Sequence, residues 1–315
     1  MSRPADLDFA AAGGTTLAAA LRARMPGRSW NDVRRLIERG KVTVDGERVL
    51  DPAVRLAPGQ QIALRLAAPT PEPPPPEGFR LVFEDVHLVI IEKPAGITTV
   101  PYERKDTGTA LDLIRTAWRR QGRAATVTPL YTVHRLDRDT SGLLCFAKTR
   151  LAERGLHTIF QRHLAEREYL AVAHDRLPAG KIRIESNLVA DRGDGIRGTP
   201  RKGQRTQGQH AVTHVEAIED LPGATLCRVR LETGRTHQIR IHLAERGHPL
   251  VGETVYIRDF LRAGRRPLPA DRLLLHAATL GFEHPVTHHP LSFRADPPPD
   301  FTAALDRLRA RAARG

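Results

Sequence analysis

A polar segment near the middle of the chain holds residues that could do chemistry on an organic substrate. It covers residues 132–144, TVHRLDRDTSGLL, and continues into an apolar run that predicts a buried strand. A loop that ends at a sheet in this way is a common place for a cleft. By residue type, Asp137 could be a nucleophile, a metal ligand or half of a structural ion pair. The ion pair is favoured on residue types alone, because structural networks also hold buried acids.

A second polar segment, TGRTHQIRIHL, covers residues 233–243. We expect Thr236 to cap a helix in which Ile239 and Leu243 share one face. Arg240 then lies roughly one turn into that helix. The segment therefore predicts a basic side chain presented from the start of a helix.

The histidines of this second segment do not predict a metal site. His237 and His242 are five residues apart, a poor spacing for two ligands on one helix face, and neither a cysteine nor a carboxylate accompanies them. We expect both to form hydrogen bonds or to pack. Cys145 and Cys227 are the chain's two cysteines, each in an apolar run, so we expect buried free thiols and no disulfide framework.

The patterns around these segments predict an α+β domain that positions them. Residues 80–101 contain apolar runs on both sides of a polar turn at Glu84 and Asp85, followed by a Lys-Pro-Ala-Gly turn that starts at Lys93. Helical windows then alternate with β-like runs, which favours a mixed, largely antiparallel sheet. The expected helices are 111–119 and 154–163, and the expected strands are 169–173, 226–231 and 273–282.

A proline-rich stretch divides the chain into two domains. Six of the ten residues 69–78, PTPEPPPPEG, are proline, which favours an extended linker without a core. We therefore expect a small domain at 1–68, a linker at 69–78 and a large domain at 79–315. Residues 191–209 are polar and glycine-rich, and we expect them to be a mobile surface loop of the large domain.

The charge balance indicates a polyanionic partner. The formal net charge is +13, and only six of the 49 basic residues are lysine. Arginine grips phosphate and stacks on bases, and excess positive charge attracts nucleic acid. A GC-rich coding bias explains arginine over lysine, but not the excess of base over acid. We find no apolar run of about 18 residues and no signal-peptide pattern, so we expect a cytoplasmic protein that does not enter a membrane.

The small domain has the pattern of an RNA-binding module. Ser29 and Asp32 predict a capping-box-like helix start, Gly40 a helix end, and Asp45-Gly46 a hairpin turn. The run GRSWNDVRRLIERGKVTVDGERV, with PGQQI after it, resembles the S4 RNA-binding domain. On residue types alone the charged helix face is merely solvated. The resemblance implies that it contacts phosphates through Arg28, Arg34, Arg35 and Lys41.

The large domain resembles the RluA-type pseudouridine synthases. HRLDRDTSGLL is similar to their catalytic motif, and TGRTHQIRIHL to their basic motif. The segments FEDVHLVIIEKPAGI, REYLAV and RLLLHAATLGFEHP also match, in the family's order. Outside these motifs the chain departs from the family at GHPLVGETVYI, where Glu253 replaces an aspartate. The resemblance implies a pseudouridine synthase fold with a central cleft and an S4-like domain before it.

The resemblance also implies roles for individual residues. Asp137 matches the essential aspartate, Arg240 the arginine that pairs with it, and Tyr169 the aromatic ring that stacks on the target base. Arg135 matches the residue that helps to extrude the uridine. The other implied substrate contacts are Leu274 or Leu275 as an apolar floor, together with His134, Thr140, His237 and Gln238. The resemblance implies neither a metal nor an organic cofactor.

The predicted reaction is the isomerisation of uridine in RNA to pseudouridine on a base flipped out of the stack. Asp137 could attack C1′, attack C6 or remove a proton from C2′, and the sequence leaves these open. The domain layout favours large-subunit (23S) ribosomal RNA, with transfer RNA as the alternative and a monomer as sufficient. Two other hypotheses are a non-catalytic S4-type ribosome-assembly factor and a hydrolase that uses Asp137 and His134.

Overall fold

The computed structural model describes residues 6–68, 70, 75–101, 103, 106–123, 128–201 and 207–312. The chain forms two compact units, Met1–Pro74 and Pro75–Gly315. Half of the predicted linker, residues 69 and 71–74, lies outside the described residues, and so do residues 202–206 of the predicted loop. Each unit is described by itself.

The first unit is a small sheet with two helices. Its elements are β1 (Leu7–Ala10), α1 (Leu17–Arg24), α2 (Trp30–Glu38), β2 (Val42–Val44), β3 (Glu47–Arg48) and β4 (Gln61–Leu64). The strands are antiparallel in the order β1-β4-β2-β3. The core joins apolar residues of both helices, such as Leu21 and Ile37, to Ile62 and Leu64 of β4. Burial of these side chains holds the helices on the sheet.

Local sequence signals fix the turns of this unit. The Ser29 hydroxyl accepts a hydrogen bond from the Asp32 amide at 3.1 Å, and the Asp32 carboxylate accepts one from the Ser29 amide at 3.2 Å. This capping box starts α2, as predicted. Asp45 and Gly46 have φ angles of 51° and 85°, which a two-residue hairpin of the predicted kind requires.

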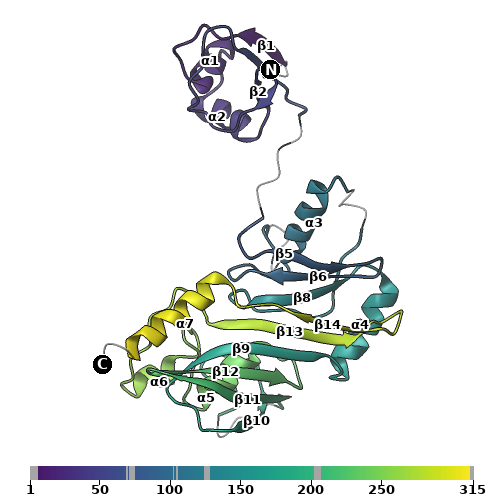
Figure 1. Ribbon diagram of the computed structural model, residues 1–315, viewed down its shortest axis with the longest axis vertical. Coiled ribbons are helices and arrows are strands. Elements are labelled where there is room, and N and C mark those ends of the chain that lie inside the picture. The colour runs from purple at the N-terminus through teal and green to yellow at the C-terminus, as the bar shows by residue number, and fades with distance from the viewer. Residues whose placement is uncertain are drawn as a thin grey trace. The chain divides into compact units, whose positions relative to one another are not determined.

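The second unit is built on one large sheet (Figure 1). Its strands are β5 (Arg80–Glu84), β6 (Leu88–Lys93), β7 (Tyr131–Thr132), β8 (Ser141–Ala147), β9 (Glu166–His174), β10 (Lys181–Leu188), β11 (Gln209–Leu221), β12 (Ala224–Leu231), β13 (Leu275–Glu283) and β14 (Pro290–Arg294). The main order is β10-β11-β12-β9-β13-β8-β6-β5, with β14 on β13 and β7 on β8. Of these pairings only β8 with β13 is parallel. The prediction of an α+β domain with a mixed, largely antiparallel sheet is confirmed.

Helices cover both faces of this sheet. The helices are α3 (Ala110–Arg120), α4 (Arg150–Gln161), α5 (Gln238–Glu245), α6 (Arg258–Arg262) and α7 (Pro299–Ala312). One face packs against α3 and α5, through Trp118 and Ile239 among others. The other face packs against α4 and α7, through Leu156 and Phe301. Figure 1 shows α7 lying along the sheet near β13 and β9.

The centre of the sheet requires a glycine. Gly142 of β8 lies beside β13 with a φ of 114°, and a Cβ there would lie 2.2 Å from the Ala277 carbonyl oxygen. Only glycine allows the two strands to approach so closely. The start of β8, and with it the polar loop that precedes it, is thereby fixed against β13.

Both cysteines are buried as free thiols, as predicted. Within the described ranges, no group of three or more His, Cys, Asp or Glu residues could hold a metal ion. No helix among those described is long and apolar enough to span a membrane.

Candidate active site

The loop that carries Asp137 is held from both sides by buried polar groups. The Thr99 hydroxyl donates to the Leu136 carbonyl at 2.9 Å and accepts from the Leu136 amide at 3.2 Å. On the other side, the Lys93 ammonium donates to the Arg138 carbonyl at 3.1 Å. Burial lowers the pKa of Lys93 to about 7, while the charges of Asp139 and Asp137 oppose that effect. Fixed backbone at 136 and 138 leaves the Asp137 carboxylate little freedom.

Arg240 lies between two carboxylates. Its Nη1 is 3.4 Å from Asp137 Oδ2, the partner that the family resemblance implies. Its Nε and Nη2 donate to the two oxygens of Glu253, at 2.7 and 2.8 Å. The Glu253 side chain is fully buried and also accepts amide hydrogen bonds from residues 254–256. Glu253 therefore fixes the plane of the guanidinium and leaves one edge for Asp137.

A histidine and a tyrosine complete the surroundings of the carboxylate. His237 Nε2 is 3.7 Å from Asp137 Oδ1, and His237 Nδ1 is 2.7 Å from the Tyr256 hydroxyl. Burial lowers the pKa of His237, while the charge of Asp137 opposes that effect. Burial raises the pKa of Tyr256 to about 12. A Tyr256 hydroxyl that donates to Nδ1 leaves the imidazole proton on Nε2, which faces Asp137.

These groups open into a cavity of about 560 Å³. Tyr169 of β9 and Leu275 of β13 lie on its walls, and Ile239 of α5 contributes another apolar side chain. Leu274 does not line it, because it packs on the opposite face of the sheet in the cluster that contains Phe301 of α7. Of the two residues predicted as alternatives for the apolar floor, Leu275 lines the cavity and Leu274 does not. Neighbouring residues of a strand point to opposite faces, which separates the two leucines.

The other predicted substrate contacts fall into two groups. Arg135 and Thr140 line the cavity, and the buried Thr140 hydroxyl has no hydrogen-bond partner among the described residues. Gln238 also borders the cavity, but its amide is occupied by Thr233, Val212 and other groups of the sheet.

His134 has a structural position in the cavity wall. Its Nε2 accepts a hydrogen bond from the Cys145 amide at 3.0 Å, and its ring stacks on Phe160 at 4.4 Å. Burial, with the nearby charge of Arg167, lowers the pKa of His134 to about 3. A histidine whose ring nitrogen is used by the backbone is poorly placed as a general base for Asp137, which disfavours the hydrolase hypothesis.

The start of α5 differs from the prediction. His237, with a left-handed φ of 59°, is the N-cap residue, and no side chain caps the helix. Thr236 instead accepts a hydrogen bond from Arg135 Nη2 at 3.1 Å. The prediction of Thr236 as helix cap is wrong. The threonine links the two polar segments that the sequence pattern singled out.

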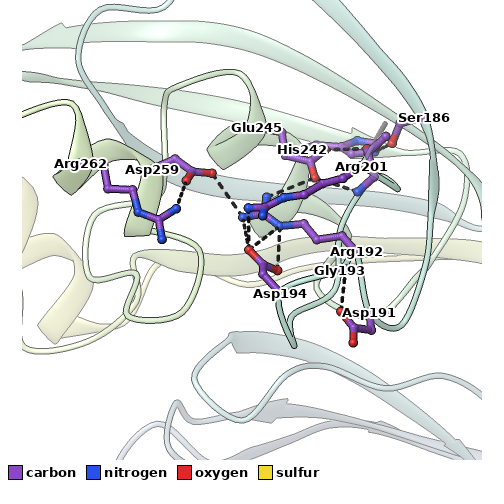
Figure 2. Close-up of polar contacts among 11 residues, drawn as sticks. Ser186, Asp191, Arg192, Gly193, Asp194, Arg201, His242, Glu245, Asp259 and Arg262 are labelled. Carbon is purple, nitrogen blue, oxygen red and sulfur yellow. Dashed lines mark hydrogen bonds and ion pairs between the residues drawn. The ribbon is translucent and has the colours of Figure 1, made fainter. Parts of the chain in front are cut away.

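Part of the predicted loop at 191–209 is anchored. Figure 2 shows Arg192 reaching Asp194 and Asp259, and its Nη2 lies 3.2 Å from a carboxylate oxygen of each. Val189 pairs with Gly198 in an isolated bridge. The exposed Arg197 on this loop contributes to lowering the pKa of His237, after burial and Arg240. The described part of the loop is therefore held by ion pairs and by a strand-like bridge.

The same view shows His242, which forms hydrogen bonds as the sequence predicted. One ring nitrogen lies 3.1 Å from the Ser186 hydroxyl (Figure 2), and the other lies 2.8 Å from the Thr213 hydroxyl. Burial lowers the pKa of His242 to about 4.

In the first unit, the predicted phosphate contacts lie on and beside α2. Arg28 and Arg35 border a depression of about 210 Å³ that also includes Arg39, a residue outside the predicted set. Arg34 is exposed beside them. The Lys41 ammonium donates to the Ala68 carbonyl. The depression is a basic surface with room for an anion.

Sequence reasoning missed three residues of the cavity and its surroundings. Glu253 and Tyr256 belong to GHPLVGETVYI, a segment whose sequence alone does not link Glu253 to Arg240. Arg167 belongs to the REYLAV segment and lies two residues before Tyr169. Since residues i and i+2 of a strand share a face, that spacing alone could have placed Arg167 in the cavity.

The chain is similar to known RNA pseudouridylate synthases. Residues 87–245 match the RNA pseudouridylate synthase family, and residues 16–62 match the S4 domain. The chain is 34% identical over 310 residues to the ribosomal large subunit pseudouridine synthase D of Zymomonas mobilis, with 94% of each chain covered. It is 35% identical to the protein of that name from Vibrio parahaemolyticus, with 86% of this chain and 83% of the relative covered. Human RNA pseudouridylate synthase domain containing 1 has a similar fold, with a TM-score of 0.58 at 22% identity over 78% of this chain and 98% of the human one.

Proposed function

This chain belongs to the RNA pseudouridylate synthase family, and from that premise we propose that it isomerises uridines of large-subunit ribosomal RNA with Asp137 as the catalytic carboxylate. One observation carries the assignment of the residue. Of the two carboxylates that contact Arg240, Asp137, at 3.4 Å, is the one that lines the cavity, which Tyr169 also lines. The cavity volume of about 560 Å³ lies within the range of small-molecule sites and admits one flipped nucleoside.

The cavity residues can hold a uridine that has left the RNA stack. Extrusion of a base costs stacking energy, and an arginine plane can replace part of it. Arg135 is exposed at the cavity and suits that role. Tyr169 and Leu275 offer a ring and an apolar side chain to the two faces of the uracil. The base is thereby held while its bond to the ribose changes.

The carboxylate and the guanidinium then act on the glycosidic bond. Pseudouridine formation breaks N1–C1′, turns the ring and joins C5 to C1′, so an ionised carboxylate beside C1′, C2′ and C6 serves each of the three routes open to Asp137. Arg240 supplies the opposite charge beside Asp137, and Glu253 keeps Arg240 in place. His237 Nε2 faces the same carboxylate, so its N–H can donate to the carboxylate oxygen as the charge there changes during the reaction.

The choice of RNA rests on the relatives and on the S4 domain. The Zymomonas and Vibrio relatives are named for the ribosomal large subunit. The S4 domain gives a second basic surface for a structured RNA. All groups of the site come from one chain, so a monomer suffices, and the cytoplasm is where such RNA is assembled in bacteria.

The catalytic assignment is tested by Asp137→Asn beside Asp139→Asn. Asp139 is a more exposed carboxylate of the same loop that pairs with Arg138, so it is a matched control for loss of charge. We expect Asp137→Asn to form no pseudouridine, by carbodiimide primer extension, while binding RNA within a few-fold of wild type. Asp139→Asn should keep most activity. Pseudouridine formed by Asp137→Asn would show that another group does the chemistry.

The RNA target is tested by mapping pseudouridines in total RNA from cells with and without the gene. We expect the lost sites to lie in large-subunit ribosomal RNA. Sites lost only from transfer RNA would refute that target while leaving the reaction in place.

A further inference from the structure

Arg167 is a buried arginine in the wall of the catalytic cavity that the proposed reaction does not use. It lies on β9 two residues before Tyr169, so both side chains point to the same face of the sheet. Only 8% of the residue is exposed. Its Nη2 donates to the Glu232 carbonyl at 3.0 Å, and its guanidinium lies 5.8 Å from the centre of the Phe160 ring.

The charge of Arg167 has no carboxylate partner among the described residues. Its Nε is buried without a hydrogen-bond acceptor. The neighbouring Glu168, on the other face of the strand, instead pairs with Arg228 and Arg230. Burial lowers the pKa of Arg167. A buried, unpaired guanidinium is costly to folding, and its retention in a cavity wall indicates that an anion satisfies it there.

The surroundings of Arg167 leave room for that anion. Gly234 follows Thr233 in the basic motif, and a Cβ at this position would lie 2.5 Å from Arg167 Nη1. Arg235, which follows Gly234 in the chain, and His163 also line the cavity. The carboxylate near them is Glu232, which lies 2.6 Å from His214 and 4.0 Å from Arg183. This end of the cavity is therefore cationic.

We propose that Arg167, with Arg235 beside it, binds the backbone phosphodiester next to the flipped uridine. The inference rests on the proposed function, because the uracil occupies the part of the cavity lined by Tyr169 and Leu275. Tyr169 is two residues from Arg167, about 7 Å along the strand. The anion that a bound nucleotide brings into such reach is its own phosphate. The planar fork of an arginine suits two phosphate oxygens.

A charge-removal cycle tests this subsite. The probe is an RNA hairpin that carries the mapped uridine, in whichever RNA it lies, made with normal linkages or with neutral methylphosphonate linkages on both sides of that uridine. We expect wild type to bind the neutral form about 10- to 100-fold more weakly, the range for loss of charge-assisted hydrogen bonds. Arg167→Gln should bind the normal RNA more weakly by a similar factor and show little further loss with the neutral form. Equal losses on neutralisation in wild type and variant would overturn the proposal, since a merely structural arginine leaves the phosphate contact intact.

Two further variants distinguish loss of the phosphate contact from misfolding. Arg228→Gln removes an arginine that pairs with Glu168 on the other face, and it should keep the wild-type loss on neutralisation. Gly234→Ala should displace the Arg167 guanidinium without removing it. Like Arg167→Gln, it should bind the normal RNA more weakly and show little further loss with the neutral RNA. If Gly234→Ala loses as much affinity as wild type when the phosphates are neutralised, with an unchanged melting temperature, the result counts against the subsite. Wild-type conversion of the normal hairpin is measured in the same series, so failure of the reaction is distinguished from failure of the phosphate contact.

Discussion

Replacing Glu253 by Gln should slow the reaction because it disturbs the position of Arg240. Glu253 itself does not line the cavity. Glu253 is fully buried and accepts both Nε and Nη2 of Arg240, at 2.7 and 2.8 Å. Removing one charge of a buried ion pair costs about 3–5 kcal/mol. Glutamine keeps the volume and one carbonyl oxygen, so we take the lower end, about 3 kcal/mol, which lowers the melting temperature by about 6–12 °C for a domain of this size.

The effect on the reaction follows from the lost alignment of the guanidinium. With one oxygen of residue 253 replaced by an amide NH₂, Nε and Nη2 lose their paired acceptors, and Nη1 no longer has a fixed position beside Asp137. A misplacement of about 1 Å at a catalytic group costs about 100-fold in rate. We therefore expect the single-turnover rate of Glu253→Gln to fall about 100-fold, with RNA affinity within a few-fold of wild type.

The assay is release of tritium from RNA whose uridines are labelled at C5, because C5 gives up its hydrogen when it joins C1′. Glu253→Asp is the matched control, since it keeps the charge and shortens the side chain by one methylene. We expect Glu253→Asp to retain more activity than Glu253→Gln. A folded Glu253→Gln with a wild-type rate would refute the alignment role. Equal defects in the two variants would show that side-chain length, not charge, controls Arg240.

The remaining predictions concern stability and RNA binding. Burial would raise the pKa of Glu84, but hydrogen bonds from Arg123, Lys148 and Trp118 lower it from 4.5 to about 2. The carboxylate therefore stabilises the fold above pH 4.5, by about 3 kcal/mol, and this contribution is lost as the pH falls towards 2. Urea unfolding should show Glu84→Gln less stable than wild type at pH 7, with a gap that narrows below pH 4.5; a constant gap would contradict this. Arg35→Ala should weaken RNA binding and reduce the slope of log affinity against log salt by about 0.9, and an unchanged slope would show that α2 does not contact phosphate.

Local patterns in the sequence determined most of the elements and the class of fold. The capping box of Ser29 and Asp32 and the turn at Asp45-Gly46 depend on residues next to each other in the chain, and both formed as predicted. Apolar runs likewise predicted β9, β12 and β13 with small errors at their ends. The motifs around Asp137 and Arg240 indicated the family, which the comparisons then showed. These features can be predicted without the tertiary structure because they depend on residues close together in the chain.

Tertiary structure decided which side chains meet. Leu274 and Leu275 are equally apolar in the sequence, and only the pairing of β13 decides which faces the cavity. From the sequence, Thr236 is a candidate helix cap, but in the fold its hydroxyl accepts a hydrogen bond from Arg135, about 100 residues earlier in the chain. Glu253 is important because it forms a buried ion pair with Arg240. Arg167 is important because its buried guanidinium has no carboxylate partner among the described residues. Burial and partnership of charge are properties of the packed chain, since they depend on which distant groups exclude water and which supply the opposite charge.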